Sequence, residues 1–330
     1  MAVVKLSCVN VGYGDAFFFE GAEGNCLMDT GSGMAQEYEG YPERIDILRF
    51  LKNKEIKHID HLILSHIHDD HVGNLVKLLK EFSVNKIWIP KGFGEIKDIE
   101  IFGDHPNFRK KSSELFFRAL RVFASALDFC AKRGIEVEEL CEGEHKRLSG
   151  LELKVLGAAP ERTETFLRYY RSLSECKDPA AAEELVEKMD AFSNHTSLLL
   201  KIGYKSFRGL FCADNVPGNW SKQIGEELED VNFIKLPHHG QRDAIDTERM
   251  RRMPLLYCLT TSSSERRYNS ANPEIYKNLS DWAREDKRDL KILFTDPSEE
   301  YRDLKEVEYG NTSIVFEIDE NICYQYKNQK

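Results

Sequence analysis

The chain has 330 residues, a formal net charge of −10, 41% hydrophobic residues and 31% charged residues. These proportions are ordinary for a soluble globular protein with a sizeable core, and the length allows one large domain or two small ones. The negative balance argues against a protein that coats nucleic acid with broad basic surfaces. It leaves open nucleic acid bound in a cleft, where metal ions would supply positive charge.

Cysteine usage and the start of the chain indicate a cytoplasmic location. The eight cysteines are scattered without a close pair, which is typical of free thiols in a reducing compartment. The apolar start of the chain is too short and too quickly charged to be a signal peptide. No apolar run approaches the ~18 residues of a transmembrane helix, so we expect no membrane segment.

The first third of the chain is rich in predicted strands. Apolar stretches predict strands at 3–8, 17–19, 26–28, 59–65 and 86–90, and helical spacing predicts a helix over 42–53. Residues 91–191 differ in character. Helices are predicted over 112–133, 163–173 and 179–191, with a strand at 151–156. We interpret 91–191 as a mainly helical insertion within a single domain, 1–330, that covers one side of the site.

The rest of the chain returns to alternating strands and helices. Strands are predicted at 197–202, 207–213, 232–236, 255–261, 291–295 and 311–318, and a helix is predicted over 273–284. The first two of these strands are expected to form a hairpin.

The strand predicted at 59–65 leads into the densest cluster of functional side chains. His66, His68, Asp70 and His71 follow it on a loop before a predicted helix, where a rigid scaffold usually carries functional groups. Imidazole and carboxylate suit zinc, manganese or iron(II). His66 and His68 are two apart and point the same way on an extended segment, whereas Asp70 and His71 follow the turn and could face a second metal. The alternative is a solvated polar loop, but three histidines at these offsets favour a metal site.

Two metals need more ligands than this loop supplies, and three places downstream offer them. The candidates are Asn194 with His195, Asp214, and His238 with His239. Each adjoins an apolar strand, so each could lie at the same sheet edge as His66. Asp214 could bridge two cations. Taken singly, an aspartate at a strand end is often a cap, and paired histidines before a glycine can simply close a loop.

The order of these motifs resembles that of the metallo-β-lactamase-fold hydrolases. It is most similar to the branch that includes the hydrolase domain of the DNA-uptake channel protein ComEC. The motifs that carry the resemblance are Asp29-Thr30-Gly31, His66-x-His68-x-Asp70-His71, residues 11–16, 194–198 and 236–240. Three positions depart from that branch: Tyr13 replaces a common Gln, Ala213 a usual Gly, and Asn272 a common His.

The resemblance implies an α/β (α+β) protein, a four-layer αββα sandwich with a helical insertion and two divalent metal ions (zinc or manganese, with iron possible) at one edge of the sheets. His66 and His68 would bind the first metal, with Asn194 or His195 nearby. Asp70, His71 and one of His238 or His239 would bind the second. Asp214 would bridge them, and Asp29 and Asp15 would support the ligands from behind.

Two cations that share a water lower its pKa and stabilise the charge that develops on attack. Asp70 or Asp214 can receive a proton during turnover, and His238 is the expected substrate contact. We therefore expect a hydrolase, with a small-molecule or nucleic-acid phosphodiester as the leading substrate. The polar loop with Ser262, Arg266, Arg267 and Tyr268 is suited to phosphate, although it could be a mobile connection.

Other functions stay open on the sequence alone. A lactone, thioester or phosphorylcholine ester is an alternative substrate, because fold does not dictate substrate. A metal-binding regulatory or interaction protein with little turnover is the alternative from another class. The helical insertion could act as a lid, a homodimer surface or a docking site for a protein partner.

Overall fold

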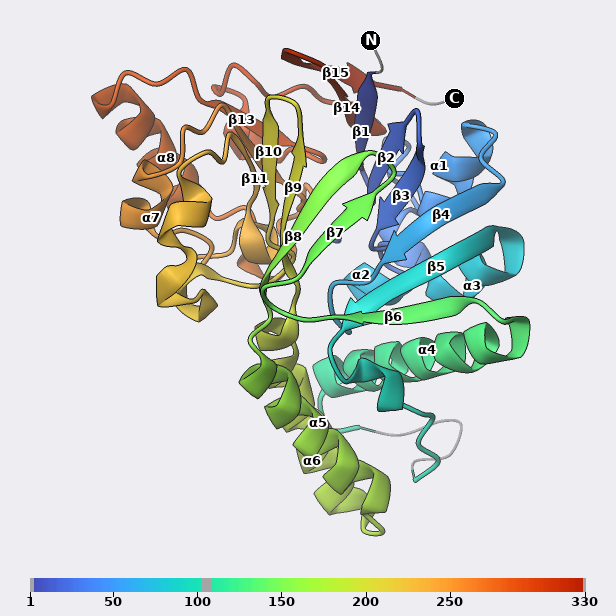
Figure 1. The fold of residues 1–330 in the computed structure, drawn as a ribbon. Helices are drawn as coiled ribbons and strands as arrows, with labels where there is room; N and C mark the ends of the chain where they lie inside the picture. The colour runs from blue at the N-terminus through green and yellow to red at the C-terminus, as the bar shows by residue number, and fades with distance from the viewer. Residues whose placement is uncertain (1–2, 102–107, 329–330) are drawn as a thin grey trace.

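A computed structural model describes residues 3–101 and 108–328, and its core consists of two β-sheets stacked face to face (Figure 1). The first sheet has eight strands in the order β15-β14-β1-β2-β3-β4-β5-β6 and the second has seven in the order β13-β12-β11-β10-β9-β8-β7. Helices cover the outer face of each sheet. This arrangement confirms the predicted αββα sandwich.

The bounds of the elements are as follows. The first sheet contains β1 (Val4–Val9), β2 (Phe17–Gly21), β3 (Gly24–Met28), β4 (His58–Ile63), β5 (Ser83–Pro90), β6 (Glu136–Leu140), β14 (Ser313–Ile318) and β15 (Ile322–Lys327). The second contains β7 (His145–Leu148), β8 (Leu151–Gly157), β9 (Leu199–Tyr204), β10 (Phe207–Phe211), β11 (Phe233–Lys235), β12 (Tyr257–Thr260) and β13 (Lys291–Phe294). The helices are α1 (Ile47–Asn53), α2 (Asp69–Val72), α3 (Leu75–Glu81), α4 (Lys111–Arg133), α5 (Pro160–Glu175), α6 (Pro179–Ser193), α7 (Thr247–Arg251) and α8 (Pro273–Glu285).

Alternation along strand β2 shows how the layers are built. Phe17 and Phe19 point between the sheets and pack edge-on against Phe211 of β10. Phe18 points to the opposite face and packs against Phe50 of α1. Successive side chains of a strand face opposite sides, so three consecutive phenylalanines serve two separate cores. A third core joins the second sheet to α7 and α8.

Parallel pairing brings the strand ends that carry polar residues to one place. Strands β3, β4, β5 and β6 are parallel in the first sheet, as are β10, β11, β12 and β13 in the second. The carboxyl ends of parallel strands share one edge of their sheet, where ligands commonly bind. The loops after β4, β10 and β11 therefore meet at that edge.

Most predicted elements agree with the structure. Helix α4 matches its predicted range and ends at Gly134, which has the left-handed φ of 68° that favours glycine. The helix predicted over 42–53 begins only at Ile47, because the Asp46 side chain caps it by accepting the Arg49 backbone N–H. Its predicted start at Pro42 is wrong.

The segment 91–191 contains α4, α5 and α6, and it also supplies β6, β7 and β8 to the two sheets. Helices α5 and α6 form a hairpin that extends away from the sheets (Figure 1). Strands β6, β7 and β15 were not predicted from sequence. All three are edge strands, and their many charged or exposed residues hide the apolar pattern of a strand.

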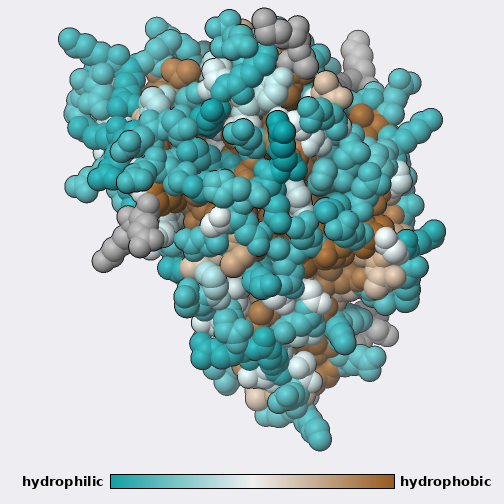
Figure 2. All heavy atoms as spheres, viewed as in Figure 1, coloured by the Kyte–Doolittle hydropathy of each residue, from teal (hydrophilic) through white to brown (hydrophobic). Residues whose placement is uncertain are grey.

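The surface is polar. The face in Figure 2 is mostly hydrophilic, with hydrophobic residues showing between polar ones. No helix in the described ranges is both long and apolar enough to cross a membrane.

All eight cysteines lie within the described ranges and are free thiols, in agreement with the prediction from their spacing.

Candidate metal centre

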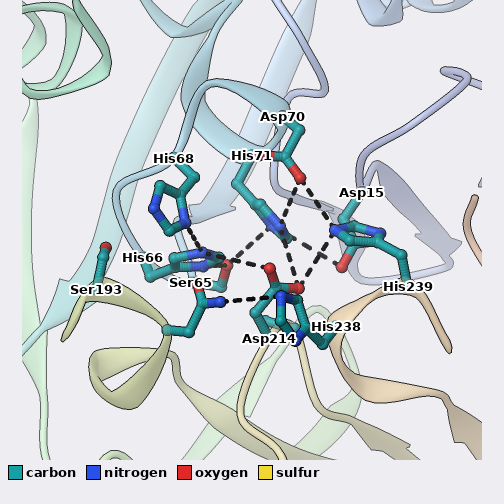
Figure 3. Close-up of polar contacts among 12 residues, drawn as sticks. Asp15, Ser65, His66, His68, Asp70, His71, Ser193, Asp214, His238 and His239 are labelled. Atoms are coloured by element: carbon teal, nitrogen blue, oxygen red, sulfur yellow. Dashed lines mark hydrogen bonds and ion pairs between the residues drawn. The ribbon is translucent and has the colours of Figure 1, made fainter. Parts of the chain in front are cut away.

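Four side chains from three segments that follow strands converge at the shared sheet edge (Figure 3). We call Asp70, His71, Asp214 and His239 the four-ligand group. His239 Nε2 lies 3.0 Å from Asp70 Oδ2 and 3.3 Å from Asp214 Oδ1, and His71 Nε2 lies 3.4 Å from each of these oxygens. The first two residues follow β4, Asp214 follows β10 and His239 follows β11.

These four atoms have the environment of metal ligands. Each is buried and, within the described part of the chain, none makes a hydrogen bond of acceptable geometry. Buried polar atoms without partners are rare because they are costly, so four that face one point call for an explanation. Ligand atoms about 2.0–2.2 Å from a tetrahedral metal lie roughly 3.3–3.6 Å from each other. The observed spacing fits one divalent cation.

A second set shares Asp214 with the first. We call His66, His68 and Asp214 the three-ligand group. His66 Nε2 lies 3.0 Å from His68 Nδ1 and 3.8 Å from Asp214 Oδ2. Asp214 thus presents Oδ1 to the four-ligand group and Oδ2 to the three-ligand group. A carboxylate in this position is suited to bridge two cations.

Hydrogen bonds on the far side of each buried ring set the tautomers. His71 Nδ1 donates to Asp29 Oδ2 at 2.8 Å, and His239 Nδ1 donates to the Thr261 carbonyl at 2.7 Å. His66 Nδ1 lies 3.1 Å from Ser65 Oγ, which itself donates to Asp29. A neutral imidazole that donates from one nitrogen has its lone pair on the other. All three rings therefore present Nε2 to the cluster.

A buried lysine adjoins the bridging carboxylate. Lys235 is inaccessible to solvent, and its Nζ lies 2.6 Å from Asp15 Oδ2, 2.9 Å from the Ala213 carbonyl and 3.9 Å from Asp214 Oδ1. Asp15 Oδ1 also accepts a hydrogen bond from Thr261 Oγ1. Asp15 thus connects Lys235 to Thr261, whose carbonyl orients the His239 ring. The close approach of Gly14 to the Asp70 carbonyl leaves no room for a Cβ and keeps this loop in place.

The site holds carboxylates ionised in spite of burial. Burial opposes ionisation of Asp214, but His239 and His71 outweigh it and keep its pKa well below the ordinary value. Burial likewise opposes ionisation of Asp70, and His71 and His239 again hold the pKa well below the usual range. For His66, burial and then His71 keep the pKa well below that of an exposed histidine. Anionic carboxylates and a neutral imidazole are the forms that bind cations.

Four residues with side chains around the centre have left-handed backbone. Asp29, Ala213, His238 and His239 have φ between 44° and 57°. This region is unfavourable for residues other than glycine, costs about 1–3 kcal/mol each and clusters at functional sites. The φ of 44° at Ala213 is one that glycine would adopt at lower cost.

A cavity of about 250 Å³ opens beside the three-ligand group. Its lining combines ligand residues with aromatic and acidic side chains: Tyr13, Glu37, His68, Asp69, Asp70, Phe116, Asp190, Asn194, Asp214, His238 and Tyr268, among others. The three acids that are not candidate ligands are paired. Glu37 pairs with Arg267, Asp69 with Arg118 and Asp190 with His68.

The structure distinguishes between the two members of each neighbouring pair of candidate ligands. Asn194 lines the cavity and its Nδ2 lies 3.1 Å from His238 Nε2, whereas His195 stacks on Phe192 and lies in none of the potential ligand groups of the described residues. His239 belongs to the four-ligand group, while His238 faces Asn194 and Asp243. His238 thus borders the cavity without joining either group.

The predicted phosphate-binding loop is only partly at the cavity. Tyr268 lines it and packs edge-on against Tyr13. Arg267 reaches the rim only through its ion pair with Glu37. Arg266 pairs with Glu300 instead, and Ser262 bonds to Ser270 in the interior. The structure does not bring these last two to the cavity.

Sequence reasoning missed several residues of the centre. Lys235 had a usable signal, since a lysine within an apolar strand that leads to paired histidines is seldom tolerated without a partner. Asp190 precedes Asn194 by one helical turn, which places both on the same helix face. Thr261 acts through its backbone carbonyl, and no sequence pattern marks it.

Part of this chain is similar to known proteins. Residues 9–117 match the family model described as the Metallo-beta-lactamase superfamily. The chain is 22% identical over 309 residues to ComE operon protein 3 of Bacillus subtilis, an alignment that covers 88% of this chain and 32% of that protein. The chain therefore spans about a third of the length of this curated relative.

Two solved structures are also similar. One is the metallo-beta-lactamase fold protein YhfI from Bacillus subtilis, with a TM-score of 0.49 and 10% identity, covering 90% of this chain and 98% of that one. The other is Igni18, a metallo hydrolase from Ignicoccus hospitalis, with a TM-score of 0.46 and 13% identity, covering 96% and 100%. The superfamily match over residues 9–117 and the two-sheet sandwich agree in assigning this chain the metallo-β-lactamase fold.

Proposed function

We propose that this protein hydrolyses phosphodiesters with two divalent cations, one in each ligand group. The observation that carries the proposal is Asp214, whose two carboxylate oxygens face the two groups at 3.3–3.8 Å from their imidazole nitrogens. Bound there, a pair of cations would acidify a shared water and stabilise the charge that develops on both the attacking and the leaving oxygen.

The cavity walls support a phosphate substrate with an aromatic substituent. No lysine or arginine is among its lining residues in the described part of the chain, so the cations themselves would attract the anion. Pairing neutralises the wall acids Glu37 and Asp69. Tyr13, Phe116 and Tyr268 offer ring faces and edges on which a base or aryl group can stack.

Three side chains at the cavity would bind the substrate or accept a proton. Asn194 Nδ2 is a neutral donor at the cavity and can bind a phosphoryl oxygen. His238 Nδ1 is held by Asp243 at 3.2 Å, which leaves its Nε2 directed at Asn194 and the substrate space. Asp70, on the cavity side of the four-ligand group, can accept the proton released on attack.

Hydrolysis of bis-p-nitrophenyl phosphate and of a labelled single-stranded oligonucleotide tests the proposal. We expect turnover that a chelator abolishes and Mn²⁺ or Zn²⁺ restores, and that Asp214→Ala loses. His145→Ala, an exposed histidine on β7, is the matched control and should keep full activity. Two bound metals with cleavage only of a lactone or thioester would refute the phosphodiester assignment, and two bound metals with no cleavage at all would favour a binding protein.

A further inference from the structure

The last turn of α6 and its C-cap residue, Asn194, contact residues in and beside the metal centre at three points. Asp190 Oδ1 lies 3.3 Å from His68 Nε2, Ser193 Oγ donates to the Ile67 carbonyl at 3.0 Å, and Asn194 Nδ2 lies 3.1 Å from His238 Nε2. Positions i, i+3 and i+4 lie on one face of a helix, so a single turn makes all three contacts. Figure 3 shows Ser193 on the side of His66 and His68.

His68 is the histidine of the centre whose tautomer the sheets do not set. Asp29, Ser65 and Thr261 orient His71, His66 and His239 from within the sandwich. His68 instead has Asp190 on its Nε2, and Phe116 of α4 packs edge-on against its ring at 5.6 Å. Both contacts come from the segment that we interpret as a helical insertion.

We propose that Asp190 is the positioning residue of His68. Its carboxylate accepts the Nε2 hydrogen, and the Nδ1 lone pair is thereby turned toward His66 Nε2 and the three-ligand group. His68 is thus the one histidine of the centre that presents Nδ1 rather than Nε2. Within the described residues, His68 is also the only polar partner of Asp190.

Helix α6 is held by packing, because Val186 and Met189 are fully buried in the same core as Phe116 of α4. Exposed ion pairs of Glu183 and Glu187 also join α6 to the residues just before α4. Arg118 of α4 in turn pairs with Asp69 in the metal loop. The contacts that orient His68 therefore come from α4 and α6, whereas His71 and His239 take their orienting hydrogen bonds from the sandwich.

Zinc titration of the metal-free protein tests this inference, which rests on the proposed dinuclear site but not on the bond that is cleaved. Loss of a hydrogen-bonded partner behind a ligand typically lowers metal affinity about 10- to 100-fold. We expect Asp190→Ala to weaken one of two zinc ions by that factor and to leave the other unchanged. Asp190→Asn, which can still accept the Nε2 hydrogen, should recover part of the loss. Glu184→Ala, an exposed carboxylate on the same helix, is the control.

The tautomer of His68 is a direct test, because it would not change if Asp190 only stabilised the fold. A long-range ¹H–¹⁵N spectrum of the metal-free protein should show His68 protonated at Nε2 in the wild type and as a tautomer mixture in Asp190→Ala. An unchanged His68 spectrum, or two unchanged zinc affinities in Asp190→Ala, overturns the inference. A wild type that binds fewer than two zinc ions instead overturns the proposed function, while the metal-free spectrum still decides the role of Asp190.

Discussion

The two ligand groups share Asp214 but differ in what supports their other members. In the four-ligand group, His71 and His239 are inaccessible to solvent and bonded to Asp29 and Thr261 of the sandwich. In the three-ligand group, His68 borders the cavity and is supported by α6. The two buried histidines of the four-ligand group thus belong to the folded core, whereas His68 is oriented where the helices meet the core.

This difference predicts an order of metal affinity. The four-ligand group has more donors, and burial and hydrogen bonds fix its two histidines before any ion arrives. Preorganised ligands lose little freedom on binding. The first ion should therefore enter the four-ligand group, and the second should respond to changes in the helices.

The largest effect is expected from Asp214→Ala, because this residue belongs to both groups. Each zinc affinity should fall by more than about 100-fold, since a lost ligand costs more than a lost supporting bond. Metal content after dialysis measures this, with the surface aspartate variant Asp281→Ala as control. Retention of one tightly bound ion would show that Asp214 does not bridge.

A comparison of His68→Ala with His239→Ala tests whether the groups are separable. His68→Ala leaves two ligands in the three-ligand group, so we expect one zinc ion to be lost and the other to keep its affinity. His239→Ala leaves three ligands in the other group and should weaken the ion that binds first in the wild type. Calorimetric titration measures both affinities. Equal effects of the two variants on both ions would contradict the comparison.

Lys235→Met addresses the electrostatics behind the four-ligand group. Removing a buried ammonium leaves Asp15 charged and unpaired, and breaking a buried ion pair costs about 3–5 kcal/mol. Urea unfolding with a chelator present should show a loss of that size in the free energy of unfolding. The double variant Lys235→Met/Asp15→Asn should recover part of it, because neither charge then remains. If both variants lose equally, packing and not charge explains the effect.

The smallest effect is expected at Glu138, which lies outside both ligand groups and contributes to the pH dependence of the free energy of unfolding. A hydrogen bond from Lys146, with burial opposing it and Trp88 and Lys86 assisting, lowers the pKa of Glu138 to about 2. Its folded pKa lies below the ordinary value of about 4.3. The stability that it contributes is thus present above about pH 4.3 and is lost as the pH falls toward 2.

Glu138→Gln should flatten the free energy of unfolding over that pH interval, with equilibrium unfolding at several pH values as the measurement. The variant should not change zinc affinity at neutral pH. Acid sensitivity that remains in Glu138→Gln can then be assigned to other groups, including the carboxylates of the centre. An unchanged pH profile would show that the contact with Lys146 does not lower the pKa of Glu138.

Local sequence determined the part of the centre that lies on one loop. His66, His68, Asp70 and His71 are within six residues, so their meeting depends only on a strand, a turn and a helix. Asp214 and His239 could be nominated because apolar strands precede them. The resemblance of the motifs predicted the sandwich fold. The long amphipathic pattern of α4 was sufficient to predict the range of that helix.

Tertiary structure alone decided the rest. His239 and not His238 faces the four-ligand group, and both residues adopt a left-handed backbone that no residue type at these positions announces. Asp190 meets His68 across 122 residues of chain, and Lys235 meets Asp15 inside the sandwich. A side chain's direction follows from its backbone angles and from what packs beside it, and both are set only when distant segments come together.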